Sequence, residues 1–171
     1  MPRRLQASTW GNFQTGDVRG VKFNPNHVLF VCLGNICRSP AAEAVLRKLE
    51  PSLSCDSAGT ASYHVGESPY GAMQWALKRR GIDVSDLRAR QFSAADFNNF
   101  GLILAMDQNN FEANEALRPV GNQVPVYLFT DFAPTAEMDH VPDPYYTRDF
   151  EGCLDLLEQA AAGLKRALID G

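Results

Sequence analysis

The chain has 171 residues, 45% of them apolar, which is enough to bury one substantial hydrophobic core. Its formal net charge of −4 argues against a general nucleic-acid binder and against a polybasic membrane-surface protein, because both need a dense excess of lysine and arginine. The longest apolar runs, at 28–33 and 102–106, are too short to cross a bilayer, so we expect no membrane insertion.

The cysteines and the N-terminus point to a compartment. The four cysteines form no C-x-x-C pair and have no metal-ligand spacing to the three histidines. Arg3 and Arg4 are not followed by the apolar segment of a secretory signal. Both features predict a cytoplasmic protein with reduced thiols.

Residues 1 to 26 show no sustained hydrophobic period and are predicted to form an N-terminal extension. A mobile tail is the favoured interpretation. The alternative is an arm that uses Trp10 and Phe13 for partner binding or targeting. Residues 27 to 171 are predicted to form a single catalytic domain.

The first regular element of that domain is predicted at 27–32, where the letters HVLFVC form a continuous apolar run typical of a strand buried on both faces. A helix is expected to follow the next loop. Its predicted N-cap is Ser39, with Pro40 at the first helical position and Glu43 at capping-box distance.

Strand and helix then alternate along the chain. We predict a strand at 53–57, a helix at 70–80 closed by Gly81, a strand at 101–106, a helix at 109–117, a strand at 124–128 and a helix at 150–169. This order indicates an α/β fold, an open parallel sheet with helices on both faces. Ligands of such sheets bind at the carboxyl ends of the strands.

The loop after the first strand carries a C-x5-R-S pattern in Cys32, Leu33, Gly34, Asn35, Ile36, Cys37, Arg38 and Ser39. A loop of this length can curl so that successive backbone N–H groups converge on one anion, reinforced by the positive end of the following helix. Gly34 and Asn35 are residue types suited to the left-handed backbone angles of such a curl. We therefore predict that the loop residues bind the phosphate of a substrate.

A thiol among those donors and beside a guanidinium is expected to have a pKa well below the ~8.5 of free cysteine. Cys32 would then be a thiolate nucleophile. Arg38 can hold two phosphate oxygens through its planar fork, and Ser39 can donate to the thiolate. The alternative, that Cys32 only ends a strand and the next residues only start a helix, is disfavoured by the strand–loop–helix context.

Together with Asp143-Pro144-Tyr145-Tyr146 far downstream, the segment VCLGNICRSP resembles the low-molecular-weight protein tyrosine phosphatase family. The resemblance covers residues 27 to 168 and includes the segments DSAGT at 56–60, ARQF at 89–92 and Met-Asp at 106–107. It implies a three-layer fold with a four-stranded parallel sheet. It also implies hydrolysis of phosphotyrosine in proteins through a phosphocysteine intermediate, without a metal or another cofactor.

The resemblance assigns roles to individual residues. Cys32 is the implied nucleophile, Arg38 the clamp of the transition state and Asp143 the general acid. The residues implied to hold the loop in shape are Asn35, Ser39 and Ser57. Phosphotyrosine-containing proteins are the implied substrates, and a bacterial tyrosine kinase is one context that the resemblance suggests.

The sequence departs from the family pattern at two places. Many members have a histidine two residues before the Ala-Arg-Gln segment, whereas this chain has Leu87, so we expect a different support of the loop asparagine. Tyr63 and His64 stand where many eukaryotic members have a different aromatic residue and an asparagine. A peptide preference is therefore not carried over.

The residues around Asp143 suit an acid that protonates the leaving oxygen. Pro142 and Pro144 restrict its backbone, and a nearby thiolate and phosphate dianion would raise its pKa. Asp-Pro is also a common turn dipeptide. Tyr145 and Tyr146 favour the catalytic interpretation because aromatic walls sandwich a phenyl ring; Tyr63 is a candidate for the opposite wall, although each tyrosine has surface packing as an alternative.

Two further residues have open alternatives. Asp107 follows a predicted strand and either caps the next helix or supports the phosphate loop or its arginine. Cys37 shares the loop with Cys32, so we predict reversible inactivation by peroxide through a disulfide between them. The alternative is that Cys37 only packs beneath the loop.

Two other functions compete with the phosphatase. An arsenate reductase on the same fold would need a resolving cysteine pair on a mobile segment, and Cys55 and Cys153 are far apart in the sequence. A non-catalytic phosphotyrosine-binding module is disfavoured by the presence of Cys32, Arg38 and Asp143.

Overall fold

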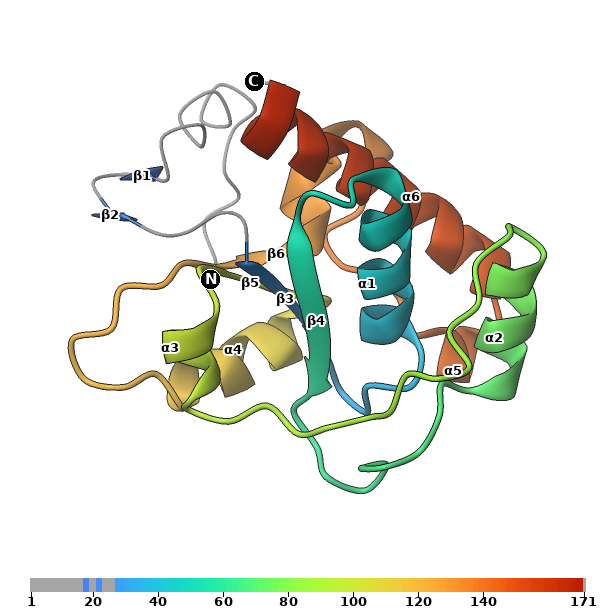
Figure 1. Ribbon diagram of the computed structural model, residues 1–171, viewed down its shortest axis with the longest axis horizontal. Coiled ribbons are helices and arrows are strands. Elements are labelled where there is room, and N and C mark those ends of the chain that lie inside the picture. The colour runs from blue at the N-terminus through green and yellow to red at the C-terminus, as the bar shows by residue number, and fades with distance from the viewer. Residues whose placement is uncertain (1–16, 19–20, 23–26, 171) are drawn as a thin grey trace.

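A parallel sheet of four strands forms the centre of the molecule in a computed structural model that describes residues 17–18, 21–22 and 27–170 (Figure 1). Its strands are β3 (His27–Cys32), β4 (Ser54–Gly59), β5 (Leu102–Ala105) and β6 (Val126–Leu128). Their order is β4-β3-β5-β6, and each neighbouring pair is parallel. The predicted α/β fold with a four-stranded parallel sheet is confirmed.

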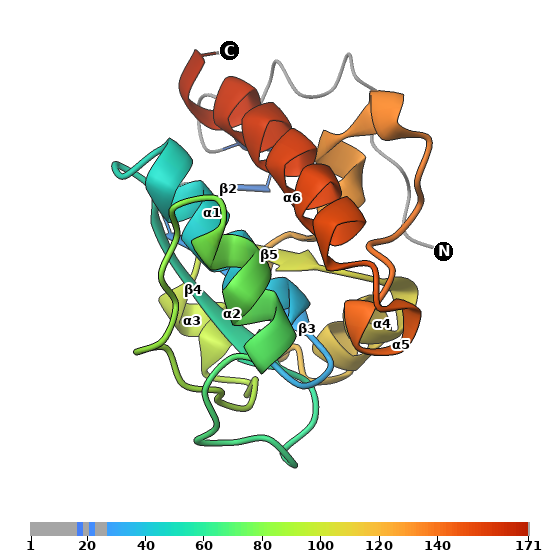
Figure 2. The same ribbon diagram turned by 90° about the vertical axis from the view of Figure 1, so that its right-hand side faces the viewer.

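Helices cover both faces of this sheet. One layer holds α1 (Arg38–Leu49), α2 (Gly71–Lys78) and α6 (Phe150–Lys165), which lie side by side in Figure 2. The other layer holds α3 (Asp96–Asn99) and α4 (Gln108–Ala116) (Figure 1). The predicted three-layer arrangement is therefore present.

The pleat of β3 divides the core between these layers. Val28 and Phe30 belong to the larger hydrophobic cluster under α1 and α6, whereas Leu29 and Val31 belong to the smaller one with Phe97 of α3. Successive side chains of a strand point to opposite faces, so a central strand with helices on both faces has to be apolar throughout. This explains the unbroken apolar run that predicted the strand.

The boundaries differ from prediction at several places. The helix α1 begins at Arg38, and its N-cap residue is Cys37, which makes no side-chain cap. The predicted cap by Ser39 and the capping box with Glu43 are wrong, because both side chains are engaged beneath the loop. The strand β4 runs two residues beyond the predicted end. Within residues 27–170, the elements that sequence periodicity missed are α3, η2 (Phe129–Phe132), η3 (Pro134–Ala136) and α5 (Pro144–Thr147).

Two other parts of the chain complete the description. The long last helix α6 continues into a π-helical turn, η4 (Arg166–Asp170). The strands β1 (Asp17–Val18) and β2 (Val21–Lys22) form a separate antiparallel pair within the predicted N-terminal extension, while Trp10 and Phe13 lie outside the described residues. Among the described helices, none has the length and apolarity needed to cross a membrane.

The topology brings three strand ends to one edge of the sheet. Cys32 ends β3, Gly59 ends β4, and Asp107 follows the end of β5. The carboxyl ends of parallel strands share one edge, so residues distant in sequence become neighbours there. The α1 helix begins at the same edge, with its N-terminus next to the loop that leaves Cys32.

Candidate active site

The loop between β3 and α1 curls around the sulfur of Cys32. Asn35 adopts the left-handed conformation with φ 57°, and its backbone N–H donates to Cys32 Sγ at 3.3 Å. Gly34, which we also expected to suit a left-handed conformation, does not have a positive φ. Its lack of a side chain has another reason, since a Cβ at Gly34 would lie 2.8 Å from Cδ2 of His64.

The side chain of Asn35 holds the loop from behind. Its amide nitrogen donates to Ser39 Oγ at 2.8 Å and to Ser57 Oγ at 2.9 Å. Its amide oxygen accepts from the backbone N–H of Arg90 at 3.0 Å. Both polar atoms of the asparagine side chain thus have hydrogen-bond partners although Leu87 stands where the family resemblance led us to look for a histidine, and Leu87 packs against the hydrophobic core.

The hydroxyl of Ser39 lies next to the sulfur. Ser39 Oγ is 3.0 Å from Cys32 Sγ and 3.3 Å from the carbonyl oxygen of Ala58. Cys32 is only 3% exposed. A hydroxyl and a backbone N–H thus both lie within hydrogen-bond distance of the Cys32 sulfur.

Gly59 is a residue that our sequence reasoning did not assign to the site. A Cβ at this position would come within 2.8 Å of the carbonyl oxygen of Leu33 and 3.0 Å of the backbone nitrogen of Asn35. The next residue, Thr60, donates its backbone N–H to the carbonyl oxygen of Cys32 at 2.9 Å. The end of β4 therefore supports the loop by direct backbone approach, which only glycine permits. A glycine ending a strand was the available signal.

Arg38 is buried and held on two sides. Its Nη1 donates to Asp107 Oδ2 and to the carbonyl oxygen of Val141, both at 2.8 Å. Its Nη2 lies 3.4 Å from Asp143 Oδ2. Burial alone would lower the pKa of Arg38, but Cys32, Asp107 and Asp143 raise it above its ordinary value. The guanidinium is a fixed positive charge with an oriented fork.

Asp107 fulfils both of the alternatives that the sequence left open. One carboxylate oxygen accepts from the backbone N–H of Asn110 at 2.8 Å and caps α4, and the other accepts from Arg38. The two oxygens of one carboxylate serve two partners. Asp107 thereby ties the arginine to the end of β5.

Asp143 is the N-cap of the short helix α5. Its Oδ1 accepts from the backbone N–H of Tyr145 at 3.0 Å, and Pro144 stands at the first helical position. The segment before it is fixed by a 2.8 Å hydrogen bond from the backbone N–H of Val141 to the carbonyl oxygen of Met106. The Asp143 carboxylate lies beside the guanidinium of Arg38 and remains 21% exposed.

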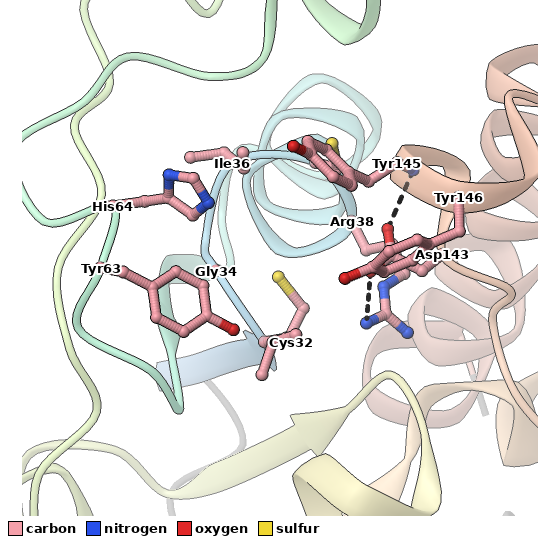
Figure 3. A pocket seen from close by; sticks show the side chains of 11 residues that line it. Cys32, Gly34, Ile36, Arg38, Tyr63, His64, Asp143, Tyr145 and Tyr146 are labelled. Atoms are coloured by element: carbon pink, nitrogen blue, oxygen red, sulfur yellow. Dashed lines mark hydrogen bonds and ion pairs between the residues drawn. The ribbon is translucent and has the colours of Figure 1, made fainter.

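These groups border one cavity of about 320 Å³ at the carboxyl edge of the sheet. Figure 3 shows Tyr63 and His64 on one side, Tyr145 and Tyr146 on the other, and Cys32 between them. The complete lining is Cys32, Leu33, Gly34, Ile36, Cys37, Arg38, Tyr63, His64, Asp143, Tyr145 and Tyr146. Of the predicted loop residues, Asn35 and Ser39 do not line the cavity and lie beneath it.

His64 was not among our predicted site residues. It lines the cavity, and its Nδ1 forms a short contact with Glu67 Oε2. Its ring also packs edge-on against that of Tyr63, with 5.1 Å between centroids. Its position next to a predicted wall tyrosine, where the family resemblance also marks a difference from eukaryotic members, was the signal in the sequence.

All four cysteines are buried, free thiols. Burial raises the pKa of Cys37, and raises the pKa of Cys55 to about 11 and that of Cys153 to about 12. Cys55 lies in β4 and Cys153 in α6, both regular elements. Neither thiol lies on the kind of mobile segment that an arsenate reductase relay would need.

The sequence and the fold of this chain are both similar to those of known proteins. The model of the family "Low molecular weight phosphotyrosine protein phosphatase" matches residues 27–170. The putative low molecular weight protein-tyrosine-phosphatase slr0328 of Synechocystis is 47% identical over 150 residues, covering 82% of this chain and 95% of the relative.

Solved structures agree. That of YfkJ from Bacillus subtilis is 38% identical with a TM-score of 0.76, covering 81% of this chain and 91% of the other. That of Vibrio vulnificus Wzb in complex with benzylphosphonate is 31% identical with a TM-score of 0.74, covering 84% and 99%. The chain belongs to the low molecular weight phosphotyrosine protein phosphatase family.

Proposed function

We propose that this chain hydrolyses phosphotyrosine in proteins with Cys32 as nucleophile, Arg38 as phosphate clamp and Asp143 as general acid and base. The observation that carries the proposal is the meeting of a thiol, an oriented guanidinium and a carboxylate in one cavity with aromatic walls. The thiol faces backbone and hydroxyl donors, which is the environment of an activated nucleophile.

In the first step, the Cys32 thiolate attacks phosphorus while the bond from phosphorus to the phenolic oxygen breaks. Asp143 gives its proton to the leaving oxygen. Arg38 exchanges its long contact with Asp143 for equatorial phosphate oxygens, while Asp107 and the Val141 carbonyl keep the guanidinium in place.

In the second step, the Asp143 carboxylate takes a proton from water, and the resulting nucleophile attacks phosphocysteine. The bond from phosphorus to sulfur breaks and inorganic phosphate leaves. The Ser39 hydroxyl at 3.0 Å stabilises the departing thiolate of Cys32, so this residue favours the second step in particular.

Selectivity for tyrosine follows from the depth of the cavity. Among the lining residues Cys32 is buried, whereas Tyr145 and Tyr146, with ring centroids 5.3 Å apart, are exposed to solvent. The phenyl ring of phosphotyrosine is long enough to pass between the aromatic side chains, and it gains contacts with them. The short side chain of phosphoserine does not reach the sulfur. The ligand of Vibrio vulnificus Wzb, benzylphosphonate, likewise joins a phenyl ring to a phosphonate.

The direct test is hydrolysis of p-nitrophenyl phosphate and of phosphotyrosine and phosphoserine peptides by wild type, Cys32→Ser and Asp143→Ala. We expect turnover of the tyrosine substrates that Cys32→Ser abolishes. Cys55→Ser is the matched control, because Cys55 is a buried thiol that does not line the cavity, and it should retain activity. Thioredoxin-dependent arsenate reduction without phosphatase activity, or phosphopeptide binding without turnover, would contradict the proposal.

The cellular context is a further part of the proposal. On the family resemblance, we place the protein in the cytoplasm and a bacterial tyrosine kinase among its substrates. Cys32→Ser used as a trap should retain phosphotyrosine proteins that vanadate releases. Recovery of phosphoproteins without any tyrosine kinase among them would contradict the kinase assignment.

A further inference from the structure

Glu43 is a buried acid that the proposed mechanism does not use. It lies on the inner side of α1 and is 3% exposed. Its Oε1 accepts from Ser57 Oγ at 2.7 Å, and its Oε2 accepts from Arg47 Nη2 at 2.7 Å. Burying a carboxylate is costly unless it is paired, so a charge at this place calls for an explanation.

The carboxylate is the end of a hydrogen-bond chain beneath the phosphate loop, which we call the support chain: Glu43, Ser57, Asn35 and Ser39. Its directions can be assigned one by one. An ionised carboxylate only accepts, so the hydroxyl hydrogen of Ser57 has to point at Glu43. Ser57 Oγ consequently faces Asn35 with a lone pair and accepts from its amide nitrogen.

The other end of the chain is set in the same way. The backbone N–H of Arg90 fixes the amide oxygen of Asn35, so its amide nitrogen has to donate to both serines. Ser39 Oγ receives one of these hydrogens. Its own hydrogen is left for the Cys32 sulfur at 3.0 Å or the Ala58 carbonyl at 3.3 Å, and a thiolate is the stronger acceptor.

We propose that Glu43 is a positioning residue of this active site: its carboxylate holds the Ser57 hydroxyl in the orientation that accepts from Asn35 and thereby, together with the backbone N–H of Arg90, directs the Ser39 hydroxyl at the Cys32 sulfur. The proposal rests on the proposed role of Cys32 as nucleophile. In this chain Glu43 and Arg47 provide the support at a place where Leu87 lacks a polar group, and Arg47 and Leu87 line the same surface cavity.

Arg47 is the counter-ion of the accepting carboxylate. Burial raises the pKa of Glu43 above its ordinary value, although the Ser57 hydroxyl and Arg47 lower it in part. The other titratable groups near Glu43 are Asp56 and the Cys55 thiol. Arg47 also donates to the carbonyl oxygen of Cys55 at 3.1 Å, which fixes the guanidinium against β4 although its side chain is 52% exposed.

The test is a double-mutant cycle of Glu43→Gln and Ser57→Ala, read out by kcat on p-nitrophenyl phosphate and by the rate at which iodoacetamide alkylates Cys32 at fixed pH. In Glu43→Gln, Arg47 holds the amide oxygen, so the amide nitrogen presents a donor to Ser57. We expect each single variant to lose on the order of tenfold in both rates, the equivalent of one hydrogen bond.

The double variant should be no slower than Ser57→Ala alone, because Glu43 acts through Ser57. Losses that multiply, or a slower turnover with unchanged alkylation, would overturn the proposal. Glu50→Gln is the matched control, since Glu50 directly follows the same helix, pairs with Lys165 and has no contact with the support chain. Abolition of turnover by Cys32→Ser tests the underlying function separately.

Arg47→Met gives a second measurement if Glu43→Gln does not fold. Without its counter-ion, Glu43 has a further raised pKa and takes up a proton at a higher pH. As the pH is lowered, turnover of Arg47→Met should therefore begin to fall at a higher pH than turnover of wild type. Glu43→Gln should lack this added pH dependence. An acid limb that is identical in Arg47→Met and wild type would contradict the proposal.

Discussion

The phosphate loop and the segment that carries Asp143 face each other across the cavity, but they are held in different ways. Beneath the loop, Asn35 and Ser39 are almost fully buried and bonded to β4 and to the backbone of Arg90. The segment around α5 lies at the surface, where Tyr146 is 71% exposed. Hydrogen bonds to neighbouring elements hold the loop in place, whereas the segment around α5, which we call the rim, lies at the surface.

One set of contacts fastens this rim to the loop. The Arg148 guanidinium donates to Tyr70 Oη at 3.0 Å and lies over the rings of Tyr70 and Phe150. The backbone N–H of Tyr70 donates to the carbonyl oxygen of Ile36 at 2.7 Å. Transition-state charge requires donors fixed in advance, whereas the acid has only to meet a leaving group brought by a protein substrate. The difference in anchoring matches these two tasks.

Among the changes to the rim, removal of the Asp143 carboxyl should lower the activity most. Asp143→Ala is expected to lower kcat/KM for phenyl phosphate by roughly 10²–10⁴-fold, the usual contribution of general acid catalysis. The loss should be smaller for p-nitrophenyl phosphate, because its leaving group needs less protonation. Asp149→Asn, which keeps the cap of α6, is the control. Equal losses on both substrates would contradict an acid role.

Disturbing the rigid side should impair binding and folding together. In Gly59→Ala the new methyl group meets the backbone of Leu33 and Asn35, so the loop has to shift. We expect a loss of about 1–3 kcal/mol in the free energy of unfolding, as for other overpacked sites, and weaker inhibition by inorganic phosphate. Gly71→Ala is the control, because nothing lies within 4 Å of its Cβ. Urea unfolding and phosphate inhibition would report both effects, and wild-type values for Gly59→Ala would contradict the close backbone approach.

Loosening the anchor of the rim should have a smaller and more selective effect. Arg148→Gly keeps the left-handed backbone at φ 64° but removes the guanidinium. We expect kcat/KM for phenyl phosphate to fall a few-fold, on the scale of about one hydrogen bond, with less change for p-nitrophenyl phosphate. Tyr70→Phe should reproduce part of this loss. If the two substrates lose rate equally, Arg148 does not act through Asp143.

Oxidation of the cysteines should affect the phosphate loop and leave the segment that carries Asp143 unchanged. We expect peroxide to inactivate the enzyme reversibly, with Cys37 capturing the oxidised sulfur of Cys32 as a disulfide. In Cys37→Ser, the fraction of activity that dithiothreitol restores, relative to the unoxidised variant, should fall. Cys153→Ser serves as a comparison because this thiol is also buried. Undiminished recovery of activity in Cys37→Ser would contradict this role and indicate that Cys37 only packs beneath the loop.

Local patterns in the sequence predicted much of the fold. The apolar run at 27–32, the helical spacing at 150–169 and the alternation between them depend on contacts that every buried strand or amphipathic helix must make. The short helix α5 was missed because four residues carry no periodicity. Ser39 and Glu43 have the composition of a cap, but a hydroxyl and a carboxylate bond whichever partners the fold presents.

The sequence by itself determined the family, the order of the longer strands and helices along the chain, and the loop with Cys32 and Arg38, because these depend on residues close together in the chain. Only the tertiary structure decided what surrounds them. It placed Gly59, His64 and the buried carboxylate of Glu43, which is bonded to Ser57 of β4, at the site. Hydrogen-bond partners across a parallel sheet come from strands separated by whole helices, and no local pattern records which of them meet.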